Sequence, residues 1–457
     1  MIESPRILMV SRHYWPHLMI DSACRDLRLA DALRRAGMRL EVWTPRFSAD
    51  WSERLTHREL VIHRPLIAPR GTWAARRYAR QVREWFETDG RDHDIWLCTG
   101  LGEEWSSLTR AAGSDRIRKL LWHSGTGEAA DHAIWSAAWG PRKLLGELNR
   151  ADGIIVSWAS AQRELLGLGV PAGRLRRIDI GVSASVTSGD GGGEPGGSSG
   201  ARTQSARCLA QANADLAVEH DTLVILACGR MGTEGGMLPL SRAFVSLAER
   251  WGDLRLWLVG DGPLRDTLHH YFRQQGVRQQ VAMPGTFVDW EDVFRVADIL
   301  VLPSLADGLE DLLPTAVGAG IPLVVADGPD MRAFFAGRER GVLWFAPGKV
   351  DQLRTAIQSC LIDRDGRREE ARQLRRAWLT QRPYQQTVTE FMRLIDGLVR
   401  AADESSFGGV GTRSPTAPNS TGGRPPGSES GNSQAASPLS GGVAAARPPS
   451  AARRPFF

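Results

Sequence analysis

Lysine is scarce in this chain of 457 residues. Lys119, Lys143 and Lys349 are the only lysines among 57 basic residues, so the other 54 (57 − 3) are arginines. The net charge of +5 is small for this length and is typical of a solvated surface, and no basic run of the kind that binds nucleic acid occurs. The sequence therefore predicts no nucleic-acid partner. We interpret the arginine bias as the mark of a GC-rich genome rather than of a function.

Paired cysteines and long apolar runs are also missing. The five cysteines are scattered and form no C-x-x-C motif, which argues against a disulfide framework and a structural zinc site. No run reaches the roughly 18 apolar residues of a membrane span. The N-terminus, MIESPRILMVSRHYWP, begins a strand without the apolar core of a secretory signal. These absences predict a soluble protein of the reducing cytoplasm.

Large apolar side chains are almost absent from two segments. Residues 186–206 are rich in Gly and Ser and predict a flexible linker. Residues 403–457 consist mainly of Ser, Pro, Gly and Ala with scattered arginines, so they lack the apolar surface that would offset the entropy of ordering. We expect this C-terminal tail to be disordered.

The rest of the chain alternates short apolar strands with amphipathic helices. Strands that are apolar throughout indicate parallel sheets covered on both faces. We predict an α/β fold with two Rossmann-like, doubly wound parallel-sheet domains that face each other across a cleft, one over 1–185 and one over 207–402 that includes a closing helix. The predicted strands cover 6–11, 39–45, 94–100, 118–125, 153–160, 222–230, 254–262, 280–287, 298–304 and 322–328.

Glycine-rich turns follow several strands of the second half. Residues 227–236 read ACGRMGTEGG, in which Gly229 and Arg230 end a strand. Residues 258–268 read LVGDGPLRDTL, with Gly262 in a tight turn before a helix. Any one such turn is also what an ordinary strand-to-helix loop requires, so only their order along the chain is informative.

The ordered set resembles a known family. From residue 225 to 353 the motifs, which include PSLADGLEDLLPTAVGAG at 303–320, are similar to the nucleotide-sugar-binding domain of GT-B glycosyltransferases of family 4. In the first half, LADALRRAGMRLEVWTP at 29–45 looks like the first helix and second strand of that family. Residues 148–182 look like the end of its acceptor-side domain.

The resemblance implies an activity and its ligands. The second domain would bind a UDP- or GDP-sugar, and the first would bind a glycan or lipid-linked acceptor. Transfer would retain the anomeric configuration and would require neither a metal nor another cofactor. A departing nucleoside diphosphate gains negative charge in the transition state, which is why such sites need cations and backbone N–H groups.

Seven positions match residues that the family uses. Two would be catalytic: His123, in LLWHSGTGE, matches a histidine near the reacting sugar, and Asp307 falls on the first of two paired glutamates. The predicted donor-binding residues are Gly229, Arg230, Gly262, Gly308 and Thr315.

Some positions, Thr315 among them, depart from the family's pattern in residue type. Gly235 stands where the family has a second cation for the diphosphate, and Thr315 has only a hydroxyl in place of the second glutamate. Ile20 and Asp21 replace a Gly-Gly turn after the first strand. Two functions therefore stay open: an active retaining glycosyltransferase, or a catalytically inactive binding or scaffold protein with the same fold. A different GT-B enzyme, such as a nucleotide-sugar epimerase, fits the motif order less well.

The segment TWAARRYARQVREWF, residues 72–86, combines aromatic residues with arginines. Trp73, Tyr78, Val82 and Trp85 fall near one helical face, which favours packing against the sheet. The alternative is that the helix rests on a membrane that carries a lipid-linked acceptor. In that case the protein would lie at the inner face of the cytoplasmic membrane.

Overall fold

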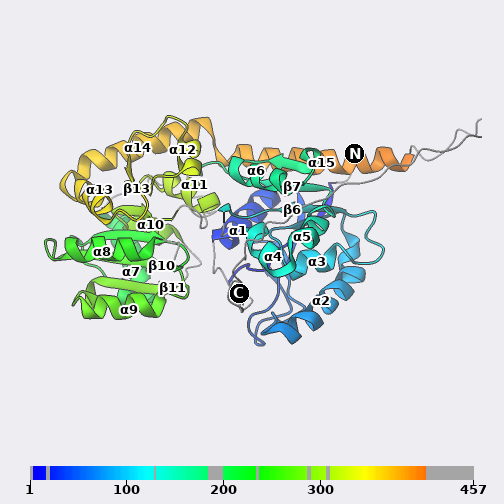
Figure 1. Cartoon of the computed structure of the whole chain (residues 1–457), viewed down its shortest axis with the longest axis horizontal. Helices are drawn as coiled ribbons and strands as arrows, with labels where there is room; N and C mark the ends of the chain where they lie inside the picture. Colours follow the sequence, from blue (N-terminus) through cyan, green and yellow to red (C-terminus); the bar gives the residue numbers. More distant parts are fainter. Residues whose placement is uncertain are drawn as a thin grey trace, which may run out of the picture. The chain divides into compact units, whose positions relative to one another are not determined.

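The computed structural model describes residues 4–16, 21–127, 130–183, 199–232, 236–285, 290–304 and 309–407. It contains two separate sheets, the first built by elements drawn from blue to blue-green in Figure 1 and the second by elements drawn from green to yellow. All neighbouring strands are parallel except one pair at the edge of the first sheet. The predicted α/β class with two Rossmann-like parallel sheets is confirmed.

The first sheet has the strand order β3-β4-β2-β1-β5-β6-β7-β8. Its strands are β1 (Arg6–Val10), β2 (Arg39–Trp43), β3 (Arg54–His57), β4 (Leu60–His63), β5 (Ile95–Cys98), β6 (Arg118–Trp122), β7 (Gly153–Val156) and β8 (Leu175–Arg177). The accompanying helices are α1 (Asp21–Arg35), α2 (Thr72–Glu87), α3 (Glu103–Leu108), α4 (Asp131–Trp139), α5 (Pro141–Leu148) and α6 (Ala159–Gly167).

The second sheet has the order β11-β10-β9-β12-β13-β14. Its strands are β9 (Leu223–Cys228), β10 (Leu254–Val259), β11 (Val281–Gly285), β12 (Ile299–Leu302), β13 (Leu323–Ala326) and β14 (Val342–Phe345). The helices of this half are α7 (Ser199–Ala212), α8 (Met237–Ala248), α9 (Arg265–Gln274), α10 (Trp290–Val296), α11 (Leu309–Ala319), α12 (Pro329–Phe335), α13 (Val350–Ile362), α14 (Arg364–Gln381) and α15 (Tyr384–Phe407).

Both faces of the sheets are buried, which explains why their central strands are apolar throughout. In β1, Leu8 and Val10 belong to one core cluster, whereas Ile7 and Met9 belong to another. Side chains of a strand alternate between the two faces, so each face has its own apolar layer. The same alternation divides β9 between two clusters.

The edge pair β3 and β4 is a short antiparallel hairpin that the sequence did not predict. Its two turn residues, Arg58 and Glu59, have φ angles of 49° and 59°. Such a turn is usually recognised by Asn or Gly, because those residues adopt a positive φ most easily. Here both turn residues are charged, so the usual signal is missing.

The C-terminal boundary of the predicted linker at 186–206 is wrong. Helix α7 already begins at Ser199, and Ser205 is buried with its hydroxyl donating to Asp292 Oδ1 at 2.6 Å. Arg202 Nη2 donates to Asp298 Oδ2 at 3.1 Å. These side chains fasten the helix onto the second half, although its sequence is small and polar. Residues 184–198 lie outside the described part.

The closing helix also departs from the predicted domain division. Helix α15 continues to Phe407, beyond the boundary at 402, and it packs against the first sheet rather than the second. Phe391 contacts Trp122 with ring centroids 4.8 Å apart. Just before α15, the backbone at Pro383 passes close to Gly181 of the first half. A Cβ added at Gly181 would lie only 2.6 Å from Pro383 O, so this close approach requires glycine. Residues 383–400 thus complete the core of the first half.

Phe391 therefore gives a direct test of this packing. We expect Phe391→Ala to lower the free energy of unfolding by about 3–5 kcal/mol, because it leaves a cavity against β6. Denaturant unfolding followed by tryptophan fluorescence measures the change. The control is Ile362→Ala, since that side chain is 71% exposed, and it should stay within about 0.5 kcal/mol of the wild type. A cost below about 1 kcal/mol for Phe391→Ala would contradict the packing.

Candidate functional site

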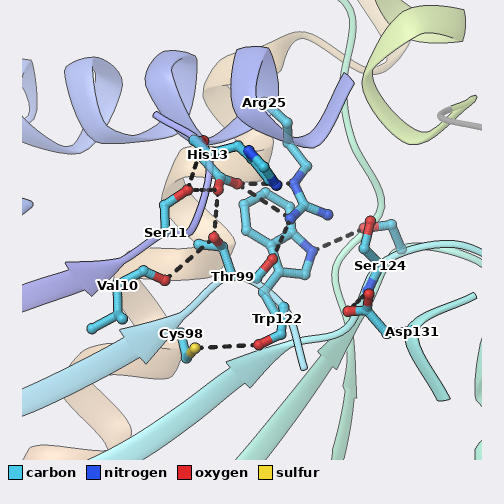
Figure 2. Close-up of polar contacts among 12 residues, drawn as sticks. Val10, Ser11, His13, Arg25, Cys98, Thr99, Trp122, Ser124 and Asp131 are labelled. Carbon is cyan, nitrogen blue, oxygen red and sulfur yellow. Dashed lines mark hydrogen bonds and ion pairs between the residues drawn. The ribbon is translucent and has the colours of Figure 1, made fainter. Parts of the chain in front are cut away.

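Polar side chains gather where three neighbouring strands of the first sheet end (Figure 2). Ser11 follows β1, Thr99 follows β5 and His123 follows β6, and β5 pairs with both β1 and β6. Parallel strands end at one edge of their sheet, and ligands of open α/β folds bind beyond that edge. This edge is the candidate site of the first half.

The carboxylate of Asp26 connects two of these strand ends. Ser11 Oγ donates to Asp26 Oδ2 at 2.7 Å, and Thr99 Oγ1 donates to the same oxygen. Burial raises the pKa of Asp26, while the adjacent Arg25 and the two hydroxyl bonds partly oppose that rise. A buried carboxylate without such partners would cost several kcal/mol. The loops after β1 and β5 are thus held to α1 by one acidic side chain.

Arg25 brings a positive charge into the same buried cluster. Its guanidinium lies 3.8 Å from the centroid of the Trp122 ring, and Nη2 donates to Thr99 O at 3.1 Å and to Asp26 Oδ1 at 3.2 Å. Only 1% of Arg25 is exposed. A desolvated cation–π contact contributes about 2 kcal/mol. Arg25 therefore fixes the end of β6, which carries His123, against the loop that follows β5.

His123 lies at the end of β6 with no exposed surface. Its Nε2 is 3.0 Å from Nδ1 of His132 in α4, and His132 Nε2 is 3.4 Å from Oε2 of Glu164 in α6. Burial, together with His132 and Arg25, lowers the pKa of His123 to about 3. The imidazole is therefore neutral near pH 7, where it acts as a hydrogen-bonding group rather than as a cation.

A second ionic cluster lies near the same edge. Arg12, after β1, donates from Nη1 to Glu104 Oε1 at 2.8 Å, and the Tyr78 hydroxyl donates to that oxygen at 2.6 Å. Glu104 is buried, whereas the Arg12 side chain is 23% exposed. The Glu104 carboxylate holds the pKa of Arg12 well above its usual value. The site thus has a permanent cation at its border.

In the second half, the predicted donor loops follow β9 and β10. Arg230 is exposed directly after β9. Gly229 has a φ of 136°, and at Gly262 an added Cβ would lie 2.7 Å from Met231 O. The loop after β10 also donates Leu264 N–H to Met231 O at 2.9 Å. Close backbone contact between the two loops therefore accounts for Gly262 without a ligand.

Thr315 is buried on α11 and already has a partner within the protein. Its hydroxyl accepts a hydrogen bond from Arg28 Nη1 of α1. The Arg28 guanidinium also lies 4.8 Å from the centroid of the Tyr384 ring. A donor hydroxyl would have to share or displace the Arg28 contact in order to reach Thr315.

Several predicted positions lie outside the described residues. They include the predicted catalytic residue Asp307 and the donor residue Gly308, together with Gly235 and Ile20. Asp21 begins α1, where only its backbone is described. Among the predicted residues that are described, His123 belongs to the first half, and Gly229, Arg230, Gly262 and Thr315 belong to the second.

The sequence did not predict Arg25, Asp26, Glu104 or His132 as site residues. One signal for Asp26 was present: it stands three and seven residues before Leu29 and Leu33, and therefore on the apolar face of the helix. A carboxylate at such a position must find buried partners. Nothing local marks His132, because its relation to His123 arises from the return of α4 to the end of β6.

Metal independence stays a prediction. Within the described residues, no group of three or more His, Cys, Asp or Glu side chains is arranged to hold a metal ion.

Two family models match the chain in the expected order. The model described as Glycosyltransferase Family 4 matches residues 27–186, which include most of the first sheet. The model described as Glycosyl transferases group 1 matches residues 222–363, which include the whole second sheet. The two matches thus cover both halves of the fold and leave out the end of the chain.

Curated relatives are similar over shorter stretches. An uncharacterized glycosyltransferase of Methanocaldococcus jannaschii is 28% identical over 151 residues, which is 32% of this chain and 38% of that protein. A lipopolysaccharide core biosynthesis glycosyltransferase, LpsD, of Rhizobium meliloti is 31% identical over 120 residues, or 26% of this chain and 34% of that protein. The chain therefore matches only about a third of the length of these relatives.

Solved structures match nearly the whole fold. Sucrose-phosphate synthase from Thermosynechococcus elongatus has a TM-score of 0.64 at 17% identity, with 87% of this chain and 100% of that chain covered. Anabaena HepE, solved with UDP and glucose, has a TM-score of 0.62 at 15% identity, with 86% and 99% covered. At such identities the likeness concerns the fold. Together with the ordered family matches, it establishes that the chain belongs to the group 1 (family 4) glycosyltransferases of the GT-B fold.

Proposed function

We propose that the protein transfers a sugar from a nucleotide-sugar donor to a glycan or lipid-linked acceptor with retention of anomeric configuration. The observation that carries the proposal is the order of the two family matches on the two sheets. HepE, a structural neighbour, was solved with UDP and with UDP-glucose. We therefore take a UDP-sugar as the first donor to test and a GDP-sugar as the second.

Each half contributes a different part of the reaction. The bond between the anomeric carbon and the diphosphate oxygen breaks, a bond to the acceptor oxygen forms, and the acceptor hydroxyl loses its proton. In this proposal Arg230, which is exposed after β9, supplies positive charge to the departing diphosphate. A unit charge 4 Å from another contributes about 4 kcal/mol at an effective dielectric of 20. Desolvation offsets part of this, which leaves about 2–3 kcal/mol.

His123 and Asp307 would act on the sugar. The His123 imidazole is neutral near pH 7, so it can exchange hydrogen bonds with sugar hydroxyls but cannot supply a positive charge. Asp307 keeps the carboxylate of the family's first glutamate on a shorter side chain. In this proposal His123 orients the sugar and Asp307 stabilises the positive charge that develops on its ring.

The inactive alternative rests on lost groups. Gly235 supplies no second cation, and the Thr315 hydroxyl is bonded to Arg28. These changes weaken donor binding, yet they leave Arg230, Asp307 and His123 in the chain. A binding or scaffold protein without turnover is therefore the second candidate, and donor binding alone does not separate it from the enzyme.

Donor binding is tested by thermal shift with UDP-, GDP- and ADP-sugars. A donor at 100 times its dissociation constant should add about 2.7 kcal/mol to the stability of the wild type. Arg230→Ala should raise the dissociation constant of the donor roughly 30- to 150-fold, which corresponds to the loss of about 2–3 kcal/mol of binding free energy.

The matched control is Arg242→Ala, which removes an exposed arginine from the neighbouring α8. This variant should bind the donor as the wild type does. If no nucleotide sugar shifts either the wild type or the control, the proposed activity loses its basis. If a donor binds but neither hydrolysis nor transfer is detected, the scaffold alternative is favoured.

For the acceptor, the outward face of α2 favours a membrane-borne substrate. Tyr78 and Val82 are buried against the sheet, as the packing interpretation predicted, and Phe86, which was not predicted, is buried with them. Trp73 is nevertheless 84% exposed, with the Arg76 guanidinium 5.6 Å from its ring. The exposed arginines of this outward face are Arg76, Arg77, Arg80 and Arg83.

Such a face suits the surface of an anionic membrane. Each arginine near an anionic bilayer contributes about 1 kcal/mol, and tryptophan prefers the interface. Glu84 is the one exposed acidic residue of the helix. None of the described helices is both long and apolar enough to cross a bilayer. We therefore propose peripheral contact through α2, at the cytoplasmic face of the membrane.

Vesicle sedimentation tests this contact. The wild type should bind vesicles of phosphatidylglycerol and phosphatidylcholine, and should bind pure phosphatidylcholine weakly. The combined changes Arg76→Glu and Arg80→Glu should reduce binding to the anionic vesicles roughly tenfold or more. As a charge-matched control, Arg372→Glu with Arg376→Glu on α14 should leave binding unchanged. Equal loss in both double variants would mean that only net charge matters.

A further inference from the structure

The buried pair His123 and His132 leaves one nitrogen without a partner. Nδ1 of His123 has no hydrogen-bond partner within the described residues, although the ring has no exposed surface. An imidazole has two nitrogens, and which of them carries the proton is set by the bond that the other makes. The chemistry offered at Nδ1 is therefore decided at Nε2, where His132 lies 3.0 Å away.

Two arrangements compete at that contact. In the first, His123 Nε2–H donates to His132 Nδ1, and His132 Nε2–H points to Glu164 Oε2, 3.4 Å away. In the second, His132 Nδ1–H donates to His123 Nε2, which also accepts the backbone N–H of His132 at 3.4 Å. A neutral His132 cannot then donate to Glu164, and it turns a lone pair toward the carboxylate.

The energies favour the first arrangement while His132 is neutral. The first arrangement turns an N–H toward the Glu164 carboxylate 3.4 Å away, whereas the second turns a lone pair toward that negative charge and keeps only a backbone hydrogen bond that is equally long. The Glu164 carboxylate is further fixed by the Gly127 N–H, which lies 3.2 Å from both of its oxygens. Glu164 therefore sets the tautomer of His132, and His132 sets the tautomer of His123.

We propose that His132 and Glu164 are positioning residues that keep the proton of His123 on Nε2 and so present Nδ1 as a hydrogen-bond acceptor for a hydroxyl of the donor sugar. The role of the sugar hydroxyl rests on the proposed function, whereas the tautomer itself does not. Because the His123 ring has no exposed surface, a sugar hydroxyl reaches Nδ1 only after the groups packed around the ring shift.

Protonation of His132 reverses the direction of the hydrogen bond between the two imidazoles. Both of its ring nitrogens then donate, so His123 Nε2 must accept and the proton of His123 moves to Nδ1. Burial keeps the pKa of His132 below its usual value, and the Glu164 carboxylate opposes this effect. The charged group that faces His123 from α1 is Arg25. Asp131, beside His132, accepts the N–H groups of Ser124 and Leu101.

Nitrogen NMR of the histidine-labelled full-length protein tests the tautomer without any substrate. At pH 7.5 we expect an unprotonated Nδ1 and a protonated Nε2 in the His123 signal, which is assigned by its loss in His123→Gln. His132→Leu should move the proton to Nδ1, because only the backbone N–H of residue 132 then faces Nε2. His132→Asn should restore the native tautomer, since its amide oxygen takes the place of the histidine Nδ1.

The control for these variants is His220→Gln, which removes an exposed histidine and should change nothing at His123. Protonated Nδ1 in the wild type at pH 7.5 overturns the proposal, as does an unchanged tautomer in a folded His132→Leu protein. Acidification of the wild type should bring the Nδ1-protonated form before the ring becomes doubly protonated. If His123 instead becomes doubly protonated without first passing through the Nδ1-protonated form, the proposed change of tautomer is wrong.

The consequence for chemistry is measured with UDP-glucose as the probe. His132→Leu should lower kcat/KM for UDP-glucose hydrolysis roughly tenfold, the effect of one hydrogen bond, and His132→Asn should recover most of it. In Glu164→Gln the acidic limb of the pH profile should shift to lower pH, because the carboxylate that favours protonated His132 is gone.

The two readouts separate two kinds of failure. If the NMR result holds but kcat/KM is unchanged in His132→Leu, the acceptor role of Nδ1 is overturned while the tautomer assignment stands. If the protein neither binds nor turns over any donor, the proposed function fails, and the NMR experiment alone decides the tautomer.

Discussion

The buried carboxylate of Asp26 is the interaction on which the edge of the first sheet depends. It accepts two hydroxyls from the ends of β1 and β5, and the guanidinium of Arg25 beside it stacks on Trp122 of β6. Because an unpaired charge in this position would cost several kcal/mol, the three strand ends must stay together as long as α1 is in place. His123 directly follows Trp122, so the contacts of this cluster also fix the position of His123.

The two halves of the protein present different chemistry. The first half has a buried network in which Asp26 and Arg25 join the ends of β1, β5 and β6, and Nδ1 of His123 is one of several buried polar atoms there without a hydrogen-bond partner among the described residues. The second half has an exposed arginine after β9 and a loop after β10 whose Gly262 is explained by backbone contact. Under the proposed function, the buried imidazole of the first half would orient the sugar and the exposed arginine of the second half would receive the diphosphate.

Much of the fold could be predicted because a parallel strand that is buried on both faces is apolar throughout, and such runs are easily recognised in the sequence. All ten predicted strands exist, within a few residues of their expected bounds. The four others were missed for identifiable reasons: the hairpin of β3 and β4 turns on Arg58 and Glu59 instead of glycine, β8 is a polar edge strand, and β14 is only half-buried. Helix α7 was missed because its composition resembles that of a linker.

By itself, the sequence determined the α/β class, the family and the positions of His123 and Arg230, because these depend on local patterns and on spacing along the chain. Tertiary structure alone decided that α15 completes the first core, that Arg28 bonds to Thr315, and that His132 and Glu164 act on His123. Each of these contacts joins residues from different elements, and the physical reason for it is packing at strand ends, which no local pattern records.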